Sequence, residues 1–174
     1  EKNIKNEKLK VIYHEINKGV GGATKTGIKY AKLINAEIIV KIDSDGQMNP
    51  KDIPKLIEPI LNNTAEFTKG NRFRNIDVLI NMPKLRLIGN IILSFITKLS
   101  TGYWELFDPT NGFIAINTKI LQRIEYEKTD NRYFFETDLL FRCGLYDLLI
   151  NEIEIPTIYK NENSDLNPIN ESYR

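Results

Sequence analysis

Residues 37–47 read Glu-Ile-Ile-Val-Lys-Ile-Asp-Ser-Asp-Gly-Gln. The β-branched run at residues 38–42 is typical of a strand that is buried in the sheet of an α/β protein. Two carboxylates, Asp43 and Asp45, follow this strand directly. Because open α/β sheets bind their ligands beyond the carboxyl ends of the strands, we expect Asp43 and Asp45 to lie in a ligand site.

The segments on either side of this stretch alternate between helical and strand-like patterns. The sequence predicts a flexible turn at Gly19–Gly22 that opens a helix through about Asn35, further helices at 50–61, 85–99 and 134–145, and strands at 11–14, 37–42, 65–73, 112–116 and 150–159, the last at a sheet edge. This order predicts an α/β fold with a mostly parallel central sheet flanked by helices. A length of 174 residues, 41% of them hydrophobic, suits a single domain over residues 1–174.

The charge and the cysteine content exclude several classes of protein. The formal net charge is +1, so no overall field recruits nucleic acid. The single Cys143 allows no internal disulfide and fits a reducing, cytoplasmic compartment. No stretch reaches the roughly 20 apolar residues that a membrane span needs. Residues 85–99 instead predict an amphipathic helix, which either packs on the core or lies peripherally at the cytoplasmic face of a membrane.

The residues after the predicted strand have the chemistry of a metal site. In extended backbone, residues two apart point the same way, so Asp43, Asp45 and Gln47 can present oxygens to one side. Hard oxygen ligands suit Mg²⁺ or Mn²⁺ bound together with substrate phosphates. A simple turn is the alternative, since Asp, Ser and Gly favour turns. A calcium loop is excluded, because Pro54 stands where such a loop needs glutamate.

Polar residues further along the chain are candidates for binding and catalysis. Arg72 and Arg86 could pair with phosphate oxygens, although exposed arginines also serve solubility. Glu136 and Asp138 lie in an aromatic and apolar setting, where burial would raise a carboxyl pKa and make a better base. The alternative for this pair is the first turn of a helix, where exposed acids are common.

Six motifs in this order resemble the inverting family-two glycosyltransferases of GT-A fold, especially the dolichyl- or polyprenyl-phosphate sugar transferases. They cover nearly the whole chain: Asn17-Lys18-Gly19 with Gly22-Ala23 and Gly27; Asp43-Ser44-Asp45-Gly46-Gln47 with Pro50; Gly70-Asn71-Arg72-Phe73; Arg86 with Gly89-Asn90; Asp108-Pro109-Thr110-Asn111-Gly112-Phe113; and Phe135-Glu136-Thr137-Asp138. The resemblance implies a GT-A-like sheet and a reaction in which a sugar leaves a nucleoside diphosphate.

The resemblance also implies roles for the candidate residues. Asp43, Asp45 and Gln47 would surround the metal, and Arg72 and Arg86 would face phosphates. The substrate site would include Asp108 and Asn111, with Asp108 near the acceptor. Asp138 matches the acidic position that acts as base on hydroxyl acceptors, with Glu136 as its nearest competitor.

The sequence departs from the family before Val11. The family's first strand, its Pro-x-Tyr-Asn-Glu-like turn and an acidic residue that contacts the nucleobase would all precede this position, where only ten mostly polar residues stand. We therefore expect a catalytic domain that is truncated at the N-terminus. If the chain is no longer than this, its activity should be weak or absent.

The expected reaction is sugar transfer from a UDP- or GDP-linked sugar to polyprenyl or dolichyl phosphate, with inversion at the anomeric carbon. Three alternatives stay open. The acceptor could instead be a saccharide in cell-surface polysaccharide synthesis. The chain could be a nucleotidyltransferase, for which Gly19-Val20-Gly21-Gly22 would supply a phosphate loop. It could also be a non-catalytic module that binds nucleotide sugars.

Overall fold

A computed structural model describes residues 8–73 and 84–155, with the backbone alone for residues 84–86. The helices are α1 (Gly19–Leu33), α2 (Ile53–Leu61), α4 (Lys84–Thr101) and α5 (Phe135–Leu145). The strands are β1 (Ile38–Lys41), β2 (Phe67–Asn71), β3 (Ile114–Asn117) and β4 (Ile150–Glu154). Short 3₁₀ turns cover η1 (Pro50–Asp52), η2 (Thr118–Ile120) and η3 (Tyr126–Lys128). The predicted helices and four of the five predicted strands are therefore present, although α1 already begins at Gly19, where a flexible turn was expected.

The four strands form one mixed sheet in the order β1-β3-β2-β4. Strand β3 is antiparallel to both β1 and β2, whereas β2 and β4 are parallel. The α/β class is confirmed, but the expected mostly parallel pairing needs a correction, because β3 runs against the other strands. The reason is its starting point. Ile114 pairs with Lys41 and Lys69, near the carboxyl ends of β1 and β2, so β3 must run back from that edge.

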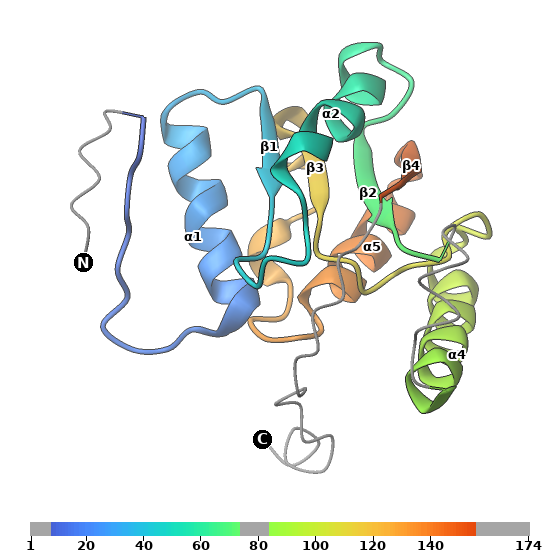
Figure 1. Ribbon diagram of the computed structural model, residues 1–174. Coiled ribbons are helices and arrows are strands. Elements are labelled where there is room, and N and C mark those ends of the chain that lie inside the picture. Colours follow the sequence, from blue (N-terminus) through green and yellow to red (C-terminus); the bar gives the residue numbers. More distant parts are fainter. Residues whose placement is uncertain (1–7, 74–83, 156–174) are drawn as a thin grey trace.

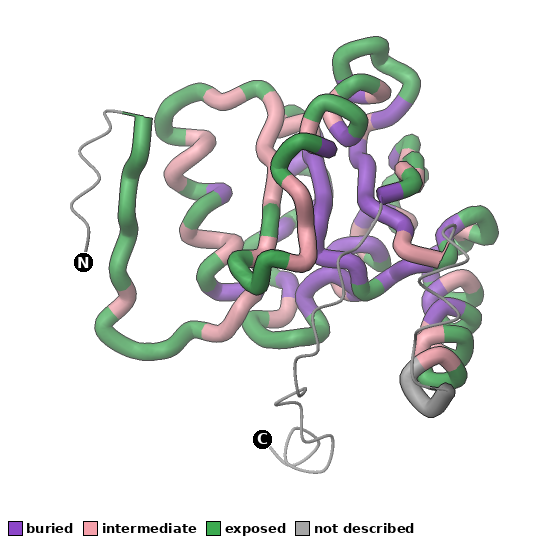
Figure 2. The backbone as a smooth tube through the Cα atoms, viewed as in Figure 1, coloured by how far each residue is buried: buried purple, intermediate pink, exposed green. Residues whose placement is uncertain are grey.

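Helices cover both faces of the sheet (Figure 1). Alternate residues of β3 point to opposite faces, as the two-residue period of a strand requires. Ile114 and Ile116 join the core cluster that includes α1 and α5, and Ala115 joins the cluster that includes α2. Figure 2 shows the buried residues concentrated along β2, β3 and α5. The carboxyl ends of β1 and β2 are thus held on a rigid, well-packed base.

The predicted strand at residues 11–14 is absent. This segment is largely exposed and lies beside α1, apart from the sheet, where it has no strand partner in the described part of the chain. Extended residues become a strand only when a neighbouring strand satisfies their backbone groups. For a similar reason β1 is half-buried and not buried as expected, since β3 is its only partner among the described strands. Strand β4 lies at an edge, as predicted.

Helix α4 turns its small polar residues inward and its large apolar residues outward. Ser94, Thr97 and Thr101 are buried, and Thr101 packs so closely on α5 that a β-carbon at Gly144 would lie 2.5 Å from the Thr101 carbonyl oxygen. Small residues allow such close helix packing. The exposed apolar stripe consists of Ile88, Ile91, Ile92, Phe95, Ile96 and Leu99, each more than half exposed. The predicted helix is confirmed, but its apolar stripe does not pack on the described core.

Across the described residues, no helix is both long enough and apolar enough to span a membrane.

Candidate active site

A cavity of about 630 Å³ opens beside the carboxyl ends of β1 and β2. Its walls come from elements that are far apart in the sequence, namely α1, the turn after β1, the end of β2, α4 and α5. The lining residues with polar side chains include Asp43, Asp45, Arg72, Asn90, Thr110 and Glu136. Four of the predicted site residues are therefore brought together around one space.

Asp43 and Asp45 both line this cavity. Gln47 is not among the lining residues, and its backbone N–H donates to Asp45 Oδ1 at 2.9 Å, which is the turn geometry expected of an Asp-Ser-Asp-Gly sequence. No group of three or more His, Cys, Asp or Glu side chains that could hold a metal occurs among the residues that the structure describes. Two carboxylates still fit a hard cation that takes its remaining ligands from a diphosphate and water.

Lys41 joins the two acidic parts of the site. Its Nζ lies 2.7 Å from Asp43 Oδ1 and 3.0 Å from Glu136 Oε1, and its side chain is only 9% exposed. Burial opposes its charge, but the carboxylates of Glu136 and Asp43 outweigh burial and raise the pKa of Lys41. Sequence reasoning missed Lys41, although its position two residues before Asp43 places both side chains on one face of the strand.

Gly112 leaves room for this ion pair. A β-carbon at this position would lie 2.4 Å from Asp43 Oδ2 and 2.5 Å from Lys41 Nζ. Any other residue at position 112 would therefore displace the carboxylate or the ammonium group.

Arg72 enters the cavity wall in a fixed orientation. Its Nε donates to Asp108 Oδ2 at 2.8 Å and its second terminal nitrogen donates to Asp108 Oδ1 at 2.7 Å. The same nitrogen donates to Thr110 Oγ1 at 3.2 Å. Bidentate pairing of this kind fixes the plane of a guanidinium group. Arg72 therefore presents a rigid, partly exposed cation to the cavity.

Asp108 and Asn111 lie behind the cavity wall and not on it. Asp108 is fully buried, and although burial alone would raise its pKa, hydrogen bonds from Arg72 and the charge of Arg72 hold this pKa below its ordinary value. Asn111 donates to Asp108 Oδ2 at 3.3 Å and accepts from the Phe113 N–H at 3.0 Å. Both residues therefore hold the turn at 107–113 in place. A direct contact of either residue with a substrate stays a prediction.

The two candidate bases occupy different places at the start of α5. Glu136 lines the cavity, whereas Asp138 is not among the lining residues. One Asp138 oxygen accepts from the Asp130 N–H at 2.8 Å, and the other lies 3.3 Å from Arg142 Nε. Glu136 is the better placed of the two, and the assignment of a base stays a prediction. The side chain of Arg86 lies outside the described residues.

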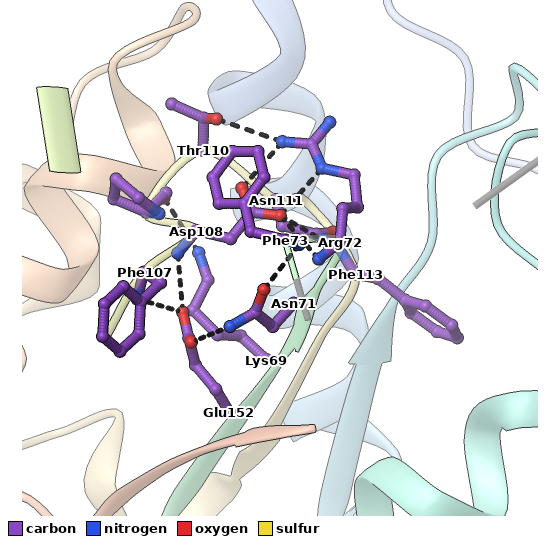
Figure 3. A network of polar contacts seen from close by, with 11 residues as sticks. Lys69, Asn71, Arg72, Phe73, Phe107, Asp108, Thr110, Asn111, Phe113 and Glu152 are labelled. Carbon is purple, nitrogen blue, oxygen red and sulfur yellow. Dashed lines mark hydrogen bonds and ion pairs between the residues drawn. The ribbon is translucent and has the colours of Figure 1, made fainter. Parts of the chain in front are cut away.

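A second polar network, missed by sequence reasoning, lies behind Arg72 (Figure 3). Lys69 is fully buried and its Nζ donates to the Pro109 carbonyl at 2.8 Å. Glu152 accepts hydrogen bonds from the backbone N–H groups of Phe107 and Asp108 at 2.9 and 2.8 Å. Burial lowers the pKa of Lys69 to about 8 and raises the pKa of Glu152. Two charged residues on neighbouring strands therefore hold the turn that carries Asp108.

A protein of known structure shares the fold. The structure superposes on glucosyl-3-phosphoglycerate synthase from Mycobacterium tuberculosis, solved with Mn²⁺ and UDP-glucose, with a TM-score of 0.61 and 19% identity, over 87% of this chain and 50% of that one. At this identity the likeness shows the fold alone. It agrees with the GT-A-like architecture that the motifs imply.

Two curated relatives act on lipid phosphates according to their names. The UDP-N-acetylglucosamine–dolichyl-phosphate N-acetylglucosaminyltransferase of Methanococcus voltae is 41% identical over 152 residues, which are 87% of this chain and 60% of the relative. The undecaprenyl-phosphate mannosyltransferase of Micrococcus luteus is 26% identical over 146 residues, which are 83% of this chain and 59% of the relative. The chain thus spans about three fifths of the length of these relatives. The family model for glycosyl transferase family 2 matches residues 1–125, and the chain belongs to this family.

Proposed function

We propose that this chain is the catalytic part of an enzyme that moves a sugar from a nucleotide-diphosphate sugar to a polyprenyl or dolichyl phosphate. The observation that carries the proposal is the single cavity in which Asp43, Asp45, Arg72 and Glu136 meet. The names of two lipid-phosphate transferases among the relatives support the same acceptor class. The 41% identical relative makes UDP-N-acetylglucosamine the first donor to test, with GDP-linked sugars as the competing class.

Asp43 and Asp45 are the proposed ligands of a divalent cation, Mg²⁺ or Mn²⁺, in the donor site. Mn²⁺ accompanies UDP-glucose in the structurally similar synthase. Such a cation neutralises the diphosphate and makes it a better leaving group. Lys41 holds Asp43 from behind at 2.7 Å, so the carboxylate keeps one orientation towards the cavity. Gln47 stays a weaker candidate ligand, since it is not among the lining residues.

Arg72 is the proposed phosphate-binding cation of the same cavity, and Arg86 is a second candidate. A phosphate acceptor is already an anion and needs little help from a base. An acceptor oxygen would attack the anomeric carbon from the face opposite the diphosphate, and the nucleoside diphosphate would leave with the bonding electrons. This displacement inverts the anomeric configuration. Glu136 and Asp138 would act as bases only for a hydroxyl acceptor.

Helix α4 is the proposed contact with the membrane that holds the lipid acceptor. Gly89, Asn90 and Leu93 line the cavity, whereas the apolar stripe of the same helix faces outward. Exposed Trp104 and Phe107 follow the helix, and aromatic residues favour membrane interfaces. A phosphate in the cavity would therefore lie beside the surface over which its lipid chain leaves. This arrangement supports a peripheral location at the cytoplasmic membrane face.

The test is sugar transfer by the natural full-length polypeptide. UDP-N-acetylglucosamine and GDP-mannose are each incubated with dolichyl phosphate, undecaprenyl phosphate or a soluble saccharide, with Mg²⁺ or Mn²⁺, and products are identified by mass spectrometry and NMR. We expect a metal-dependent glycosyl-phosphate lipid with inverted configuration. Transfer to the saccharide alone would replace the lipid acceptor by the polysaccharide alternative. Binding of nucleoside triphosphates, and not of nucleotide sugars, would favour a nucleotidyltransferase.

A further inference from the structure

Glu152 lies on the edge strand β4, outside the cavity, and makes more specific contacts than an edge residue needs. Its Oε1 accepts from the Phe107 and Asp108 N–H groups, at 2.9 and 2.8 Å, and its Oε2 accepts from Asn71 Nδ2. In the sheet register Glu152 pairs with Lys69 of β2. One carboxylate thus satisfies three donors, two of which belong to the turn that leads into the cavity wall.

The residues held by Glu152 continue directly to Arg72. Glu152 fixes the backbone N–H of Asp108, and the Asp108 carboxylate in turn accepts from the backbone N–H of Arg72 at 3.0 Å and from Nε and one terminal nitrogen of its guanidinium group. Thr110 belongs to the same turn and lines the cavity. Figure 3 shows this sequence of contacts from Glu152 through Asp108 to Arg72.

The charges of this network balance without any contribution from a substrate. Lys69 and Arg72 supply two positive charges, and Asp108 and Glu152 supply two negative charges. Buried charges are costly unless they are paired and hydrogen-bonded, so removal of one member disturbs the geometry of the others. Lys69 reinforces the same turn by donating to the Pro109 carbonyl at 2.8 Å.

We propose that Glu152 is a positioning residue of the sugar-transfer site, which sets the place of the Arg72 guanidinium group and the Thr110 hydroxyl through the turn at 107–110. It acts without touching the substrate. The inference rests on the proposed function, in which Arg72 binds a phosphate. A residue near the end of the described chain would thereby control a cavity built from elements that precede it.

Three variants separate positioning from simple support of the fold. Glu152→Gln keeps one acceptor oxygen but turns an amide group towards the Asn71 amide, so two donors face each other. The double variant Asn71→Asp with Glu152→Gln restores a donor and an acceptor there and keeps the net charge, while the residue at 71 can still accept from the Phe73 N–H. Glu66→Gln is the matched control, because Glu66 accepts from the Leu149 N–H at the other end of the same two strands.

The experiment measures kcat, the KM for nucleotide sugar and for polyprenyl phosphate, the affinity for inorganic pyrophosphate, and the thermal midpoint of the full-length protein. In Glu152→Gln we expect two quantities to rise about tenfold: the KM of the substrate whose phosphate Arg72 binds, and the dissociation constant of pyrophosphate. The change in kcat should be smaller. Arg72→Gln should raise the same two quantities at least as much. The double variant should recover most of the loss, and Glu66→Gln should change only the thermal midpoint.

Two outcomes distinguish a failure of this inference from a failure of the proposed function. If the wild-type protein transfers sugar but Glu152→Gln changes only the thermal midpoint, as Glu66→Gln does, Glu152 is not a positioning residue. If no sugar reaches polyprenyl phosphate, yet Glu152→Gln and Arg72→Gln weaken pyrophosphate binding alike and the double variant restores it, the positioning role stands and the proposed acceptor is wrong.

Discussion

Lys41 and Lys69 pair with the same residue, Ile114, from opposite sides of β3, yet their surroundings have opposite consequences. Lys41 touches two carboxylates within 3.0 Å and its pKa is raised. Lys69 is fully buried, its ammonium group donates to the Pro109 backbone carbonyl, and its pKa falls to about 8. Direct contact with carboxylates thus outweighs burial at the end of β1, whereas burial prevails at the end of β2.

The two strand ends therefore serve different purposes. Asp43 and Asp45 follow β1 and line the cavity, where a donor substrate could contact them. Asp108 and Glu152 lie near the end of β2, behind the cavity wall that they hold in place. Substitutions at the first end should therefore change chemistry, and substitutions at the second should change stability first.

The largest expected effect is on stability, at the enclosed end. Asp108→Asn removes the charge that pairs with Arg72 at 2.7 Å and leaves two cations beside one carboxylate. We expect the free energy of unfolding to fall by about 3 kcal/mol, because breaking a buried ion pair is strongly destabilising. Urea denaturation at pH 7 measures the change. Glu125→Gln, which breaks the exposed pair with Lys128, is the control and should leave the denaturation midpoint nearly unchanged.

At the open end the expected effect is on turnover. Asp45→Asn removes a proposed metal ligand from an exposed turn, so the sugar-transfer rate at saturating Mn²⁺ should fall about a hundredfold or more, while the thermal midpoint stays within about 2 °C. Asp147→Asn is the matched control, since Asp147 lies exposed in another turn at a φ of 49° that asparagine also tolerates. Similar losses of stability in Asp45→Asn and Asp108→Asn would contradict this difference between the two strand ends.

A pH series sharpens the contrast between the two lysines. The folded-state pKa of Lys69, about 8, lies below its ordinary value of 10.5. Between these values the unfolded chain binds more protons at Lys69 than the folded chain, so this residue's contribution to stability rises with pH. From pH 7 to pH 10 the wild type should gain about 1 to 3 kcal/mol relative to Lys69→Met.

The measurement for this series is urea denaturation of both proteins at several pH values. Parallel stability curves would mean that the Lys69 ammonium is not destabilised by burial, and the contrast with Lys41 would then disappear.

The smallest effect on stability is expected on α4, which belongs to neither strand end. Phe95→Glu alters an exposed residue, so the free energy of unfolding should change by less than about 0.5 kcal/mol. Binding to phosphatidylcholine–phosphatidylglycerol vesicles, measured by cosedimentation, should nevertheless fall about tenfold or more, because an apolar anchor is replaced by a charge. Leu61→Glu, at an exposed apolar position on α2, should leave vesicle binding intact. Equal losses in both variants would contradict a specific role of α4.

The sequence predicted those parts of the molecule that local patterns determine. The helices and the strand before Asp43 follow from periodicity, and the position of Asp43 and Asp45 follows from the end of that strand. The prediction of a strand at residues 11–14 was wrong, because a strand depends on partners that the segment's own composition does not reveal. The antiparallel direction of β3 was missed for a related reason, since the direction of a strand depends on where the preceding turn places its first residue.

Spacing along the chain predicts contacts within the site only where neighbours in sequence are neighbours in space, whereas Arg72 and Glu136 were singled out from their motifs. Lys41 could have been found from its spacing to Asp43. Asp108 was expected near the acceptor, but a turn motif does not say whether its carboxylate faces a substrate or an arginine. Glu152 lies 83 residues beyond Lys69 in the chain, and no short pattern links two residues that meet only through sheet pairing.

The outward apolar stripe of α4 has a consequence for evolution. Because these side chains add little to the core, mutations can rewrite the stripe without unfolding the protein. Gly89, Asn90 and Leu93, on the inner side of the same helix, border the cavity and are constrained by whatever binds there. Evolution could therefore change the proposed membrane-contacting surface of α4 while the residues of the cavity stay the same.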